Sequence, residues 1–424
     1  MSGYVGNKRS VSFVSAELPI RKGLESIVEE DGSYRLLDGA SLKRSDGNTV
    51  IHSDGTIEGV DLSPIQNQID SIEADITSLN SSVDLVEASV NQIPPRLESF
   101  RNRIINGDMQ IDQRNAGSAI TNPNVQFPVD RFGVSQYIAD TTTQRSSDAP
   151  TGFKNSLLIT NGTATAVPVS SYNYTCYQKI EGYNIDDLGF ASTDAKSITV
   201  SFWVKTSLDA TFAVSILNAA EDRSYVHTFE IENTNTWEYK SFTLTADQDT
   251  GSNWLDSTGT GLRLNFDLGS GADYNTSTLN AWQSGKKFRT SSSANFNNST
   301  NATFYITGVQ LEEGTIATPF EHRPYGLELS LCQRYFSQTW GKWYGVTQAA
   351  GFFEGCAITW PVEMRTAPTT TVSDFYTGDP TNFTDISKVG LTDVRSTGAW
   401  FWASPAKVGG NVFVRAKCQA EAEL

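Results

Sequence analysis

Apolar residues recur in alternating steps of three and four along residues 62–93, without a missed step. This heptad pattern is typical of a coiled coil, in which positions a and d form the seam between helices. β-branched residues at both positions shift the preference from dimers toward trimers or higher states. We therefore predict a parallel three-stranded stalk, with a trimer core of Leu62, Ile65, Ile69, Ile72, Ile76, Leu79, Val83, Val86, Val90 and Ile93. The alternative is a single amphipathic helix packed on a globular core.

Residues that start and stop helices mark both ends of this segment. Asp61 or Ser63 can cap its start, and Pro64 fits the first helical turn, where its missing N–H costs nothing. The Pro94-Pro95 pair predicts an abrupt end. The segment contains no Lys or Arg. Burial of the apolar side chains, rather than salt bridges between chains, must therefore hold the stalk together.

Further along the chain the apolar period changes to two. Residues 198–204 and 262–268 alternate apolar and polar side chains, which indicates strands with one buried face, and we assign Phe202 and Leu264 to the core. This pattern, with turn-rich connections, extends over about residues 125–320 and predicts two antiparallel sheets packed face to face.

The period slips by one residue in two of the predicted strands. In residues 237–244 the aromatic residues change parity, and in residues 304–311 the apolar residues change parity across Gly308. A slip of one residue predicts a β-bulge in each strand.

Before the stalk, four Asp-Gly pairs begin at residues 31, 38, 46 and 54. Asp-Gly supplies the positive φ angles of tight hairpin turns, so residues 31–60 predict a meander of short strands. Three copies of it can close into a short β neck. A disordered linker with chance Asp-Gly pairs is the alternative. Residues 1–30 show no period and predict an extended arm.

Residues 327–424 begin with a short predicted helix at 327–335, continue as short strands and hold five of the nine tryptophans. The whole chain therefore predicts a mainly β, trimeric fibre. Its predicted parts are an N-terminal arm (1–30), a short β neck (31–60), a parallel coiled-coil stalk (61–95), a β-sandwich (96–326) and a β-rich C-terminal tip domain (327–424).

Composition narrows the classes of function. The formal net charge is −16 and no cluster of Lys or Arg is present, so we expect no binding to nucleic acid. No apolar run is long enough to span a bilayer, and no secretory segment follows Met1. The four cysteines lack metal-ligand spacing, and we expect them to be reduced and mostly buried in a chain made in a cytoplasm.

Several segments resemble a family of known proteins. They are FRNRIINGDMQIDQRN at residues 100–115, GVQLEEG at 308–314 followed by ATPFE at 317–321, LCQRYF at 331–336, PVEMR at 361–365 and the ending AEL. In this order they resemble segments recurrent in tail fibres and related structural proteins of tailed bacteriophages. The resemblance implies a jelly-roll sandwich similar to carbohydrate-binding modules, placed after a trimeric stalk, and a role in attachment to the bacterial surface. The first six residues look like the virion-docking arm of such fibres, although the residues after them depart from its most familiar version.

Catalytic chemistry finds little support in the sequence. The three histidines lie far apart, and no nucleophile elbow, P-loop or zinc-protease motif is present. Asp108, Asp112 and Asp130 offer oxygen atoms near the first strands, but their spacing matches no calcium loop. We predict no catalytic residue, cofactor or metal site. The arginines at 101, 103 and 114 are predicted to pair with carboxylates.

A sugar-binding site needs aromatic faces for ring stacking and polar groups for hydroxyls. Aromatic residues in loop-like or crowded contexts are therefore the candidates for glycan binding: Trp254, Trp282, Trp340, Trp343, Tyr344, Trp400 and Trp402, with Tyr172 and Tyr174 beside them. For any single one, a place in the core or at the trimer interface is the alternative.

We therefore expect a homotrimeric tail fibre, made in the host cytoplasm and located in the virion, that binds host-surface glycan without catalysis. Its arm is expected to dock on a baseplate, tail or portal-proximal protein. Two alternatives stay open: a head fibre or capsid decoration protein without a receptor role, and a capsular polysaccharide depolymerase.

Overall fold

The computed structural model describes the helix at residues 63–92, with side chains for 65–86, and four short strands before it. After the helix it describes residues 100–121, 124–136, 140–166, 169–346, 354–378, 389–404 and 411–424. The chain divides into two units, Met1–Ser89 and Val90–Leu424, each of which is described by itself.

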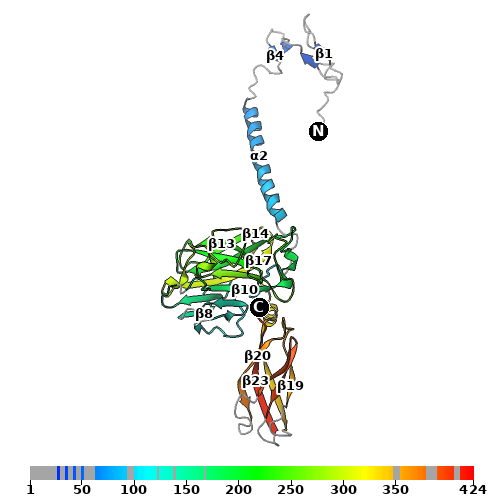
Figure 1. Cartoon of the computed structure of the whole chain (residues 1–424). Helices are drawn as coiled ribbons and strands as arrows, with labels where there is room; N and C mark the ends of the chain where they lie inside the picture. The colour runs from blue at the N-terminus through cyan, green and yellow to red at the C-terminus, as the bar shows by residue number, and fades with distance from the viewer. Residues whose placement is uncertain are drawn as a thin grey trace. The chain divides into compact units, whose positions relative to one another are not determined.

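The first unit contains two short hairpins (Figure 1). Strand β1 (Ser26–Val28) pairs antiparallel with β2 (Tyr34–Leu36), and β3 (Leu42–Lys43) pairs antiparallel with β4 (Thr49–Ile51). The Asp-Gly pairs at 31 and 46 lie between the paired strands, as a hairpin turn requires. The described strands form two separate sheets rather than the predicted continuous meander. The predicted arm lies almost wholly outside the described residues.

Helix α2 (Ser63–Gln92) confirms the predicted helix and both of its ends. Pro64 falls in the first turn, and the helix stops before the proline pair. All seven apolar side chains of the stripe between Ile65 and Val86 are between 43% and 64% exposed in the single chain. The side chains of Leu62, Val90 and Ile93 lie outside the described residues.

The second unit begins with a β-sandwich of two antiparallel sheets, which confirms a mainly β chain. The seven-stranded sheet has the order β16-β13-β12-β15-β10-β7-β6 and the six-stranded sheet the order β14-β11-β17-β9-β8-β5. The seven-stranded sheet consists of β6 (Gln126–Val129), β7 (Phe132–Ser135), β10 (Thr175–Glu181), β12 (Thr211–Leu217), β13 (Arg223–Glu230), β15 (Thr260–Asp267) and β16 (Trp282–Ser284). The six-stranded sheet consists of β5 (Ile120–Thr121), β8 (Thr141–Ser146), β9 (Ser156–Asn161), β11 (Ser197–Thr206), β14 (Glu238–Thr245) and β17 (Thr303–Glu313). Four 3₁₀ turns lie in the connections: Gly182–Asn184, Asp186–Leu188, Ala272–Tyr274 and Phe296–Asn298.

The two strands predicted from alternation face each other across the sandwich. Phe202 of β11 and Phe266 of β15 are both 1% exposed, and their ring centroids lie 5.0 Å apart, edge to face. Leu264 is fully buried. The alternating apolar residues of each strand therefore lie in the core, as expected from the side-chain period of two.

One predicted bulge is confirmed and the other is wrong. Opposite β17, Ser201 pairs with Gln310 and Trp203 with Thr307, so the extra residue lies at Gly308, whose φ is +60°. In contrast, β14 pairs with β11 in unbroken register. The aromatic residue that suggested a slip there, Tyr239, lies on the outer face, where its ring is 5.4 Å from that of Trp203.

The tip domain is a small second sandwich. Helix α3 (Tyr325–Gln333) precedes it and confirms the predicted helix, two residues earlier than expected. One three-stranded sheet has the order β18-β23-β20: β18 (Phe336–Val346), β23 (Asn411–Glu421) and β20 (Thr369–Thr377). The other has the order β19-β22-β21: β19 (Glu354–Thr359), β22 (Gly398–Ala403) and β21 (Val389–Arg395). Buried Phe401, Val414, Ala416 and Cys418 form the core between them.

Buried charges join the tip domain to the sandwich. The guanidinium of Arg131, 1% exposed, pairs with the Glu423 carboxylate, donates to the Lys179 carbonyl at 2.5 Å and lies 3.5 Å from the Tyr335 ring centroid. Glu181 accepts two hydrogen bonds from Arg334, at 2.6 and 2.9 Å. Each buried charge therefore has a partner, as the high cost of burying an unpaired ion requires.

The segments that carried the family resemblance meet around this junction. Phe100 N–H and Asn102 N–H donate to Glu321. Asn106 N–H donates to Glu328 of α3, and Arg365 donates to the carbonyls of Ala422 and Glu423. The predicted ion pairs are confirmed as well: Arg101 with Glu312, Arg103 with Asp187, and Arg114 with Asp130 and Glu423. These segments thus form a hydrogen-bonded scaffold.

The bulge generates a first prediction. Gly308→Ala places a Cβ within 3.0 Å of the Phe153 and Trp203 rings at a positive φ, so we expect a loss of at least about 1–2 kcal/mol of stability. A Cβ at Gly326 of α3 meets nothing within 4 Å, so Gly326→Ala is the matched control and should be neutral or stabilising by up to about 1 kcal/mol. Urea unfolding followed by fluorescence measures both variants. Equal stability of the two would contradict the bulge.

The junction generates a second prediction, on pH. Burial raises the pKa of Asp130 to about 6, against the opposing effect of Arg114. Because the folded-state pKa is raised, the stabilising contribution is complete below about pH 4 and is lost as the pH rises through 6. The stability of Asp130→Asn relative to wild type should therefore rise between pH 4 and 7, by at most about 3 kcal/mol.

Asp148 provides a control of opposite sign. The hydrogen bond from Lys205 lowers the pKa of this exposed carboxyl, so its contribution is present at neutral pH and is lost on acidification. Asp148→Asn should lose stability relative to wild type as the pH rises. Melting temperatures measured from about pH 2 to pH 7 cover both trends, with the Asp148 trend expected below about pH 4 and the Asp130 trend above it. Parallel curves for the two variants would contradict the assignment.

Candidate functional site

Outward-facing aromatic and cationic side chains cover the sheet β18-β23-β20 of the tip domain. Side chains of β18 alternate between the core and the outer surface. Gly341 is at an inward position, because a Cβ built on it would lie 2.3 Å from the Phe401 ring in the core. The neighbouring positions point outward, where Trp340 is 43% and Tyr344 68% exposed. We call this surface the aromatic–cationic face; it consists of Trp340, Lys342, Tyr344, Tyr376, Phe413, Arg415 and Lys417.

The strand register arranges these side chains in rows. Trp340 lies opposite Lys417, Lys342 opposite Arg415, and Tyr344 opposite Phe413. On the other side of β23, Arg415 lies opposite Tyr376. Directly opposite residues have Cβ atoms within about 5.5 Å, so each row brings its side chains into contact range.

Arg415 lies between two aromatic rings. Its guanidinium carbon is 5.2 Å from the centroid of Trp340 and 5.0 Å from that of Tyr376, both cation–π distances. The Tyr376 ring in turn contacts Phe413 edge to face at 6.1 Å. Lys417 lies 3.9 Å from the exposed Asp374 carboxylate. Among the described residues, no carboxylate forms a salt bridge with Arg415 or Lys342.

The opposite sheet, β19-β22-β21, carries a second aromatic surface, the tryptophan face, formed by Trp400 and Trp402. Phe401 between them points into the core, so both indoles lie on the outer side. Trp402 pairs with Gly355 and Gly390, and a Cβ at Gly390 would lie 2.5 Å from the indole. The absence of a side chain at Gly390 therefore allows the Trp402 indole to lie across the neighbouring strand.

The other predicted glycan-binding residues lie elsewhere. Trp343 points inward and packs against the tip core. Trp254 and Trp282 of the sandwich contact each other edge to face at 5.3 Å, and both contact Phe190. Their indole N–H groups donate to Asp247 and Ser252 and to the Thr245 carbonyl, respectively. The structure thus brings the seven candidates together in pairs, with Trp343 alone.

Two further aromatic candidates belong to the core. Tyr172 is 3% exposed and Tyr174 fully buried, and their rings lie 6.3 Å apart. Both residues lie in the loop before β10, as expected, but their burial leaves no ring face exposed for a ligand. The N–H groups of Leu268 and Gly271 donate to the carbonyls of Tyr174 and Tyr172.

Sequence reasoning missed five members of the aromatic–cationic face: Lys342, Tyr376, Phe413, Arg415 and Lys417. One signal was present, since Phe413, Arg415 and Lys417 alternate with the apolar residues between them. That parity predicts a cationic outer side of one strand. It does not reveal which residues of β18 and β20 stand opposite.

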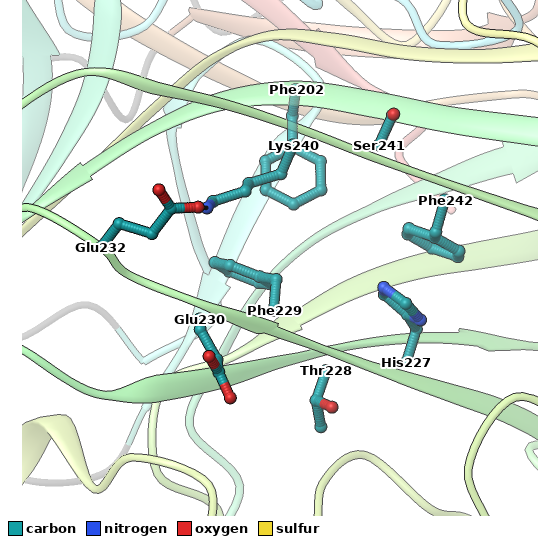
Figure 2. A pocket seen from close by; sticks show the side chains of 9 residues that line it. All are labelled: Phe202, His227, Thr228, Phe229, Glu230, Glu232, Lys240, Ser241 and Phe242. Carbon is teal, nitrogen blue, oxygen red and sulfur yellow. Dashed lines mark hydrogen bonds and ion pairs between the residues drawn. The ribbon is translucent and has the colours of Figure 1, made fainter.

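The main sandwich has a cleft of about 290 Å³ between β13 and β14 (Figure 2). Phe202, Phe229 and Phe242 form its apolar part. The His227 ring stacks on Phe242 with centroids 4.3 Å apart, and its Nδ1 lies 2.7 Å from Asn280 Oδ1. Burial lowers the pKa of His227, which favours a neutral imidazole.

The rim of this cleft carries acidic residues, one of which forms a salt bridge with Lys240. Figure 2 shows the Lys240 side chain reaching Glu232, at 3.4 Å, and Lys240 also pairs with Glu238 at 2.8 Å. A small polar ligand can therefore meet an apolar floor and a charged rim here. The hydroxyl groups of Thr228 and Ser241, which also line the cleft, add possible hydrogen-bond partners.

The acidic residues considered for calcium serve local turns and pairs. Asp112 accepts the backbone N–H groups of Asn115 and Gly117, and Asp130 accepts the Gln113 side chain and pairs with Arg114. Within the described parts of the chain, no three His, Cys, Asp or Glu residues are grouped to hold a metal ion. All four cysteines are unpaired and three are buried. No described helix is long and apolar enough to cross a membrane.

Comparison with known proteins gave likenesses in structure alone. No family model matches the chain, and no curated protein matches its sequence. The chain is similar to tailspike protein 4 of bacteriophage CBA120, in its enzymatically active domain, with 13% identity and a TM-score of 0.28, over 51% of this chain and 22% of that one. A family 4 carbohydrate-binding module is 16% identical, with a TM-score of 0.24, over 49% of this chain and 97% of that one.

A third likeness is TmCBM61, solved in complex with β-1,4-galactotriose. It is 10% identical, with a TM-score of 0.25, over 50% of this chain and 99% of that one. The chain spans about a fifth of the length of the tailspike structure. Scores this low support no inference about ligand or activity.

Proposed function

We propose that this chain is the subunit of a homotrimeric tail fibre of a tailed bacteriophage, which attaches to glycan on the host surface through its tip domain. The observation that carries the proposal is the exposure of Trp340, Tyr344 and Trp400 on the outer faces of the tip sheets. Exposed patches of large apolar side chains mark interaction sites, and each of the two tip sheets carries exposed aromatic residues on its outer face. The resemblance of residues 100–115 and the later segments to tail-fibre proteins supports the virion setting.

The chemistry of these faces suits sugar rings. An aromatic ring offers a flat apolar surface, and the hydroxyl and amino groups beside it can bind sugar hydroxyls. Contacts of this kind are weak one at a time. Once one of the three tips of a fibre is bound, binding of the other two becomes intramolecular. This raises the overall affinity by orders of magnitude. The proposed mechanism is multivalent binding without cleavage.

The apolar stripe of α2 supports the trimeric state. Seven exposed apolar side chains aligned at positions a and d are unfavourable in water, and burial against two copies of the same stripe removes them from it. The arm at residues 1–30, which lies almost wholly outside the described residues, is proposed to dock on a baseplate, tail or portal-proximal protein. The fibre is accordingly proposed to be made in the host cytoplasm and to be located in the virion.

The stripe generates a prediction about mass. Ile72→Asp places a charge in the seam and should dissociate the assembly, because an unpaired buried charge is costly. Leu85, 70% exposed, lies off the seam, so Leu85→Asp is the matched control and should leave the mass unchanged. Sedimentation equilibrium should give three times 46.4 kDa for wild type and control. A wild-type species of 46.4 kDa would sink the trimer.

The tip faces generate a prediction about binding. On an array of bacterial polysaccharides, Trp340→Ala and Trp400→Ala should each lower retention of the trimer about tenfold or more, equivalent to about 1.4 kcal/mol per site. Tyr183 of the main sandwich is 62% exposed, so Tyr183→Ala provides a control that should bind as wild type does.

Two outcomes contradict the proposal. Retention that survives both tryptophan substitutions would remove the tip from the binding site. Release of oligosaccharide from any bound polysaccharide, followed by chromatography, would replace adhesion with cleavage.

A further inference from the structure

Two cations stand directly opposite each other on the aromatic–cationic face. Lys342 of β18 and Arg415 of β23 form one cross-strand pair, and both side chains are exposed. Like charges in directly opposite positions destabilise a sheet. Within the described residues no carboxylate pairs with either, although the chain has 48 acidic and only 32 basic residues. An anion bound between them would offset this repulsion.

The surroundings of Arg415 leave its hydrogen-bond donors for a ligand. Trp340 and Tyr376 contact the guanidinium at cation–π distances. The N–H groups of a guanidinium lie in its own plane, at its edge, and form a fork that matches the two oxygens of a carboxylate. Aromatic contacts also hold the long side chain in place, so less conformational entropy is lost when a ligand binds.

The charge of this face contrasts with that of the whole chain. The net charge of the chain is −16, yet among the described residues the face carries Lys342, Arg415 and Lys417 against one carboxylate, that of Asp374, which lies 3.9 Å from Lys417. Lys342 and Arg415 are then the two cations without a carboxylate partner, and this number suits a ligand that carries singly charged anionic groups. A symmetric contact with a second copy would place these cations against each other. Tyr344 and Phe413, in the next row, offer aromatic surface beside the cations.

We propose that the aromatic–cationic face selects an acidic glycan, one whose sugar rings carry carboxylates as uronic acids do. Arg415 receives the carboxylate through its N–H edge, Lys342 adds a second cation, and Trp340 and Tyr344 contact the sugar ring. This inference rests on the proposed glycan-binding function and adds the charge class of the ligand.

The test uses the full-length protein on an array with three probes: polygalacturonate, its methyl ester, and a phosphate-bearing polysaccharide without uronate. Wild type should bind polygalacturonate at least tenfold more strongly than the ester, and added salt should narrow the difference. Arg415→Gln should lower binding to polygalacturonate roughly 10- to 100-fold and abolish the preference over the ester.

Two further variants separate charge selection from structure. Arg395 of β21 lies in the other sheet and is 71% exposed, so Arg395→Gln makes the same charge change elsewhere and should leave the preference intact. Lys342→Gln removes the like-charge repulsion, so its melting temperature should equal or exceed that of wild type while binding to polygalacturonate falls. A purely structural role for Lys342 would instead lower the melting temperature and leave selectivity unchanged.

The array separates failure of this inference from failure of the proposed function. Equal binding of both galacturonans, with loss of both in Trp340→Ala, would keep glycan adhesion and overturn charge selection. Preference for the phosphate-bearing probe would overturn the carboxylate assignment. A change in sedimenting mass on Arg415→Gln would make the face an interface between copies. No retention of wild type on any probe or any bacterial polysaccharide would overturn both proposals.

Discussion

The buried pairing of Arg131 with Glu423 is the constraint on which the second unit depends. A guanidinium that is 1% exposed needs a permanent partner, and its partner comes from the far end of the chain. The same region holds the Glu181–Arg334 pair and the Asp130–Arg114 pair. These pairs oblige residues 100–115, α3 and the last three residues to pack in one place. The tip sheets are therefore anchored to the sandwich by charge as well as by apolar contact.

This arrangement explains why the segments with a family resemblance are rich in Asn, Arg and Glu. The Asn102 amide bonds the backbone of Val309 and Leu311, far along the chain, and the Asn106 amide bonds the backbone of Ile111 and Asp130. Each such residue satisfies backbone groups that the junction buries. The resemblance therefore lies mainly in a scaffold, whereas the exposed aromatic side chains lie on strands outside those segments. A scaffold of this kind can carry different outer faces.

The two faces of the tip domain use their sheets differently. On the tryptophan face, Gly390 makes space for the Trp402 indole across the neighbouring strand, and Gly355 allows the close approach of the Phe401 backbone. On the aromatic–cationic face, large side chains crowd the rows, and Arg415 is held between rings. Both arrangements accept a local cost, either the weak strand propensity of glycine or repulsion between cations. Such costs are expected at surfaces shaped by a ligand rather than by stability alone.

The sequence by itself determined the elements whose signal is local. The heptad spacing and its flanking prolines placed α2, the alternation in β11 and β15 identified their buried faces, and Gly308 marked a bulge. Predictions from these features were confirmed because the side-chain period and the backbone conformations of proline and glycine depend only on residues close in the chain. Tertiary structure decided what depends on partners distant in the chain: the regular register of β14, the inward place of Tyr172, and the alignment of Lys342 with Arg415. Strand parity tells which side a residue faces, but only the packed sheet determines which side chain stands opposite.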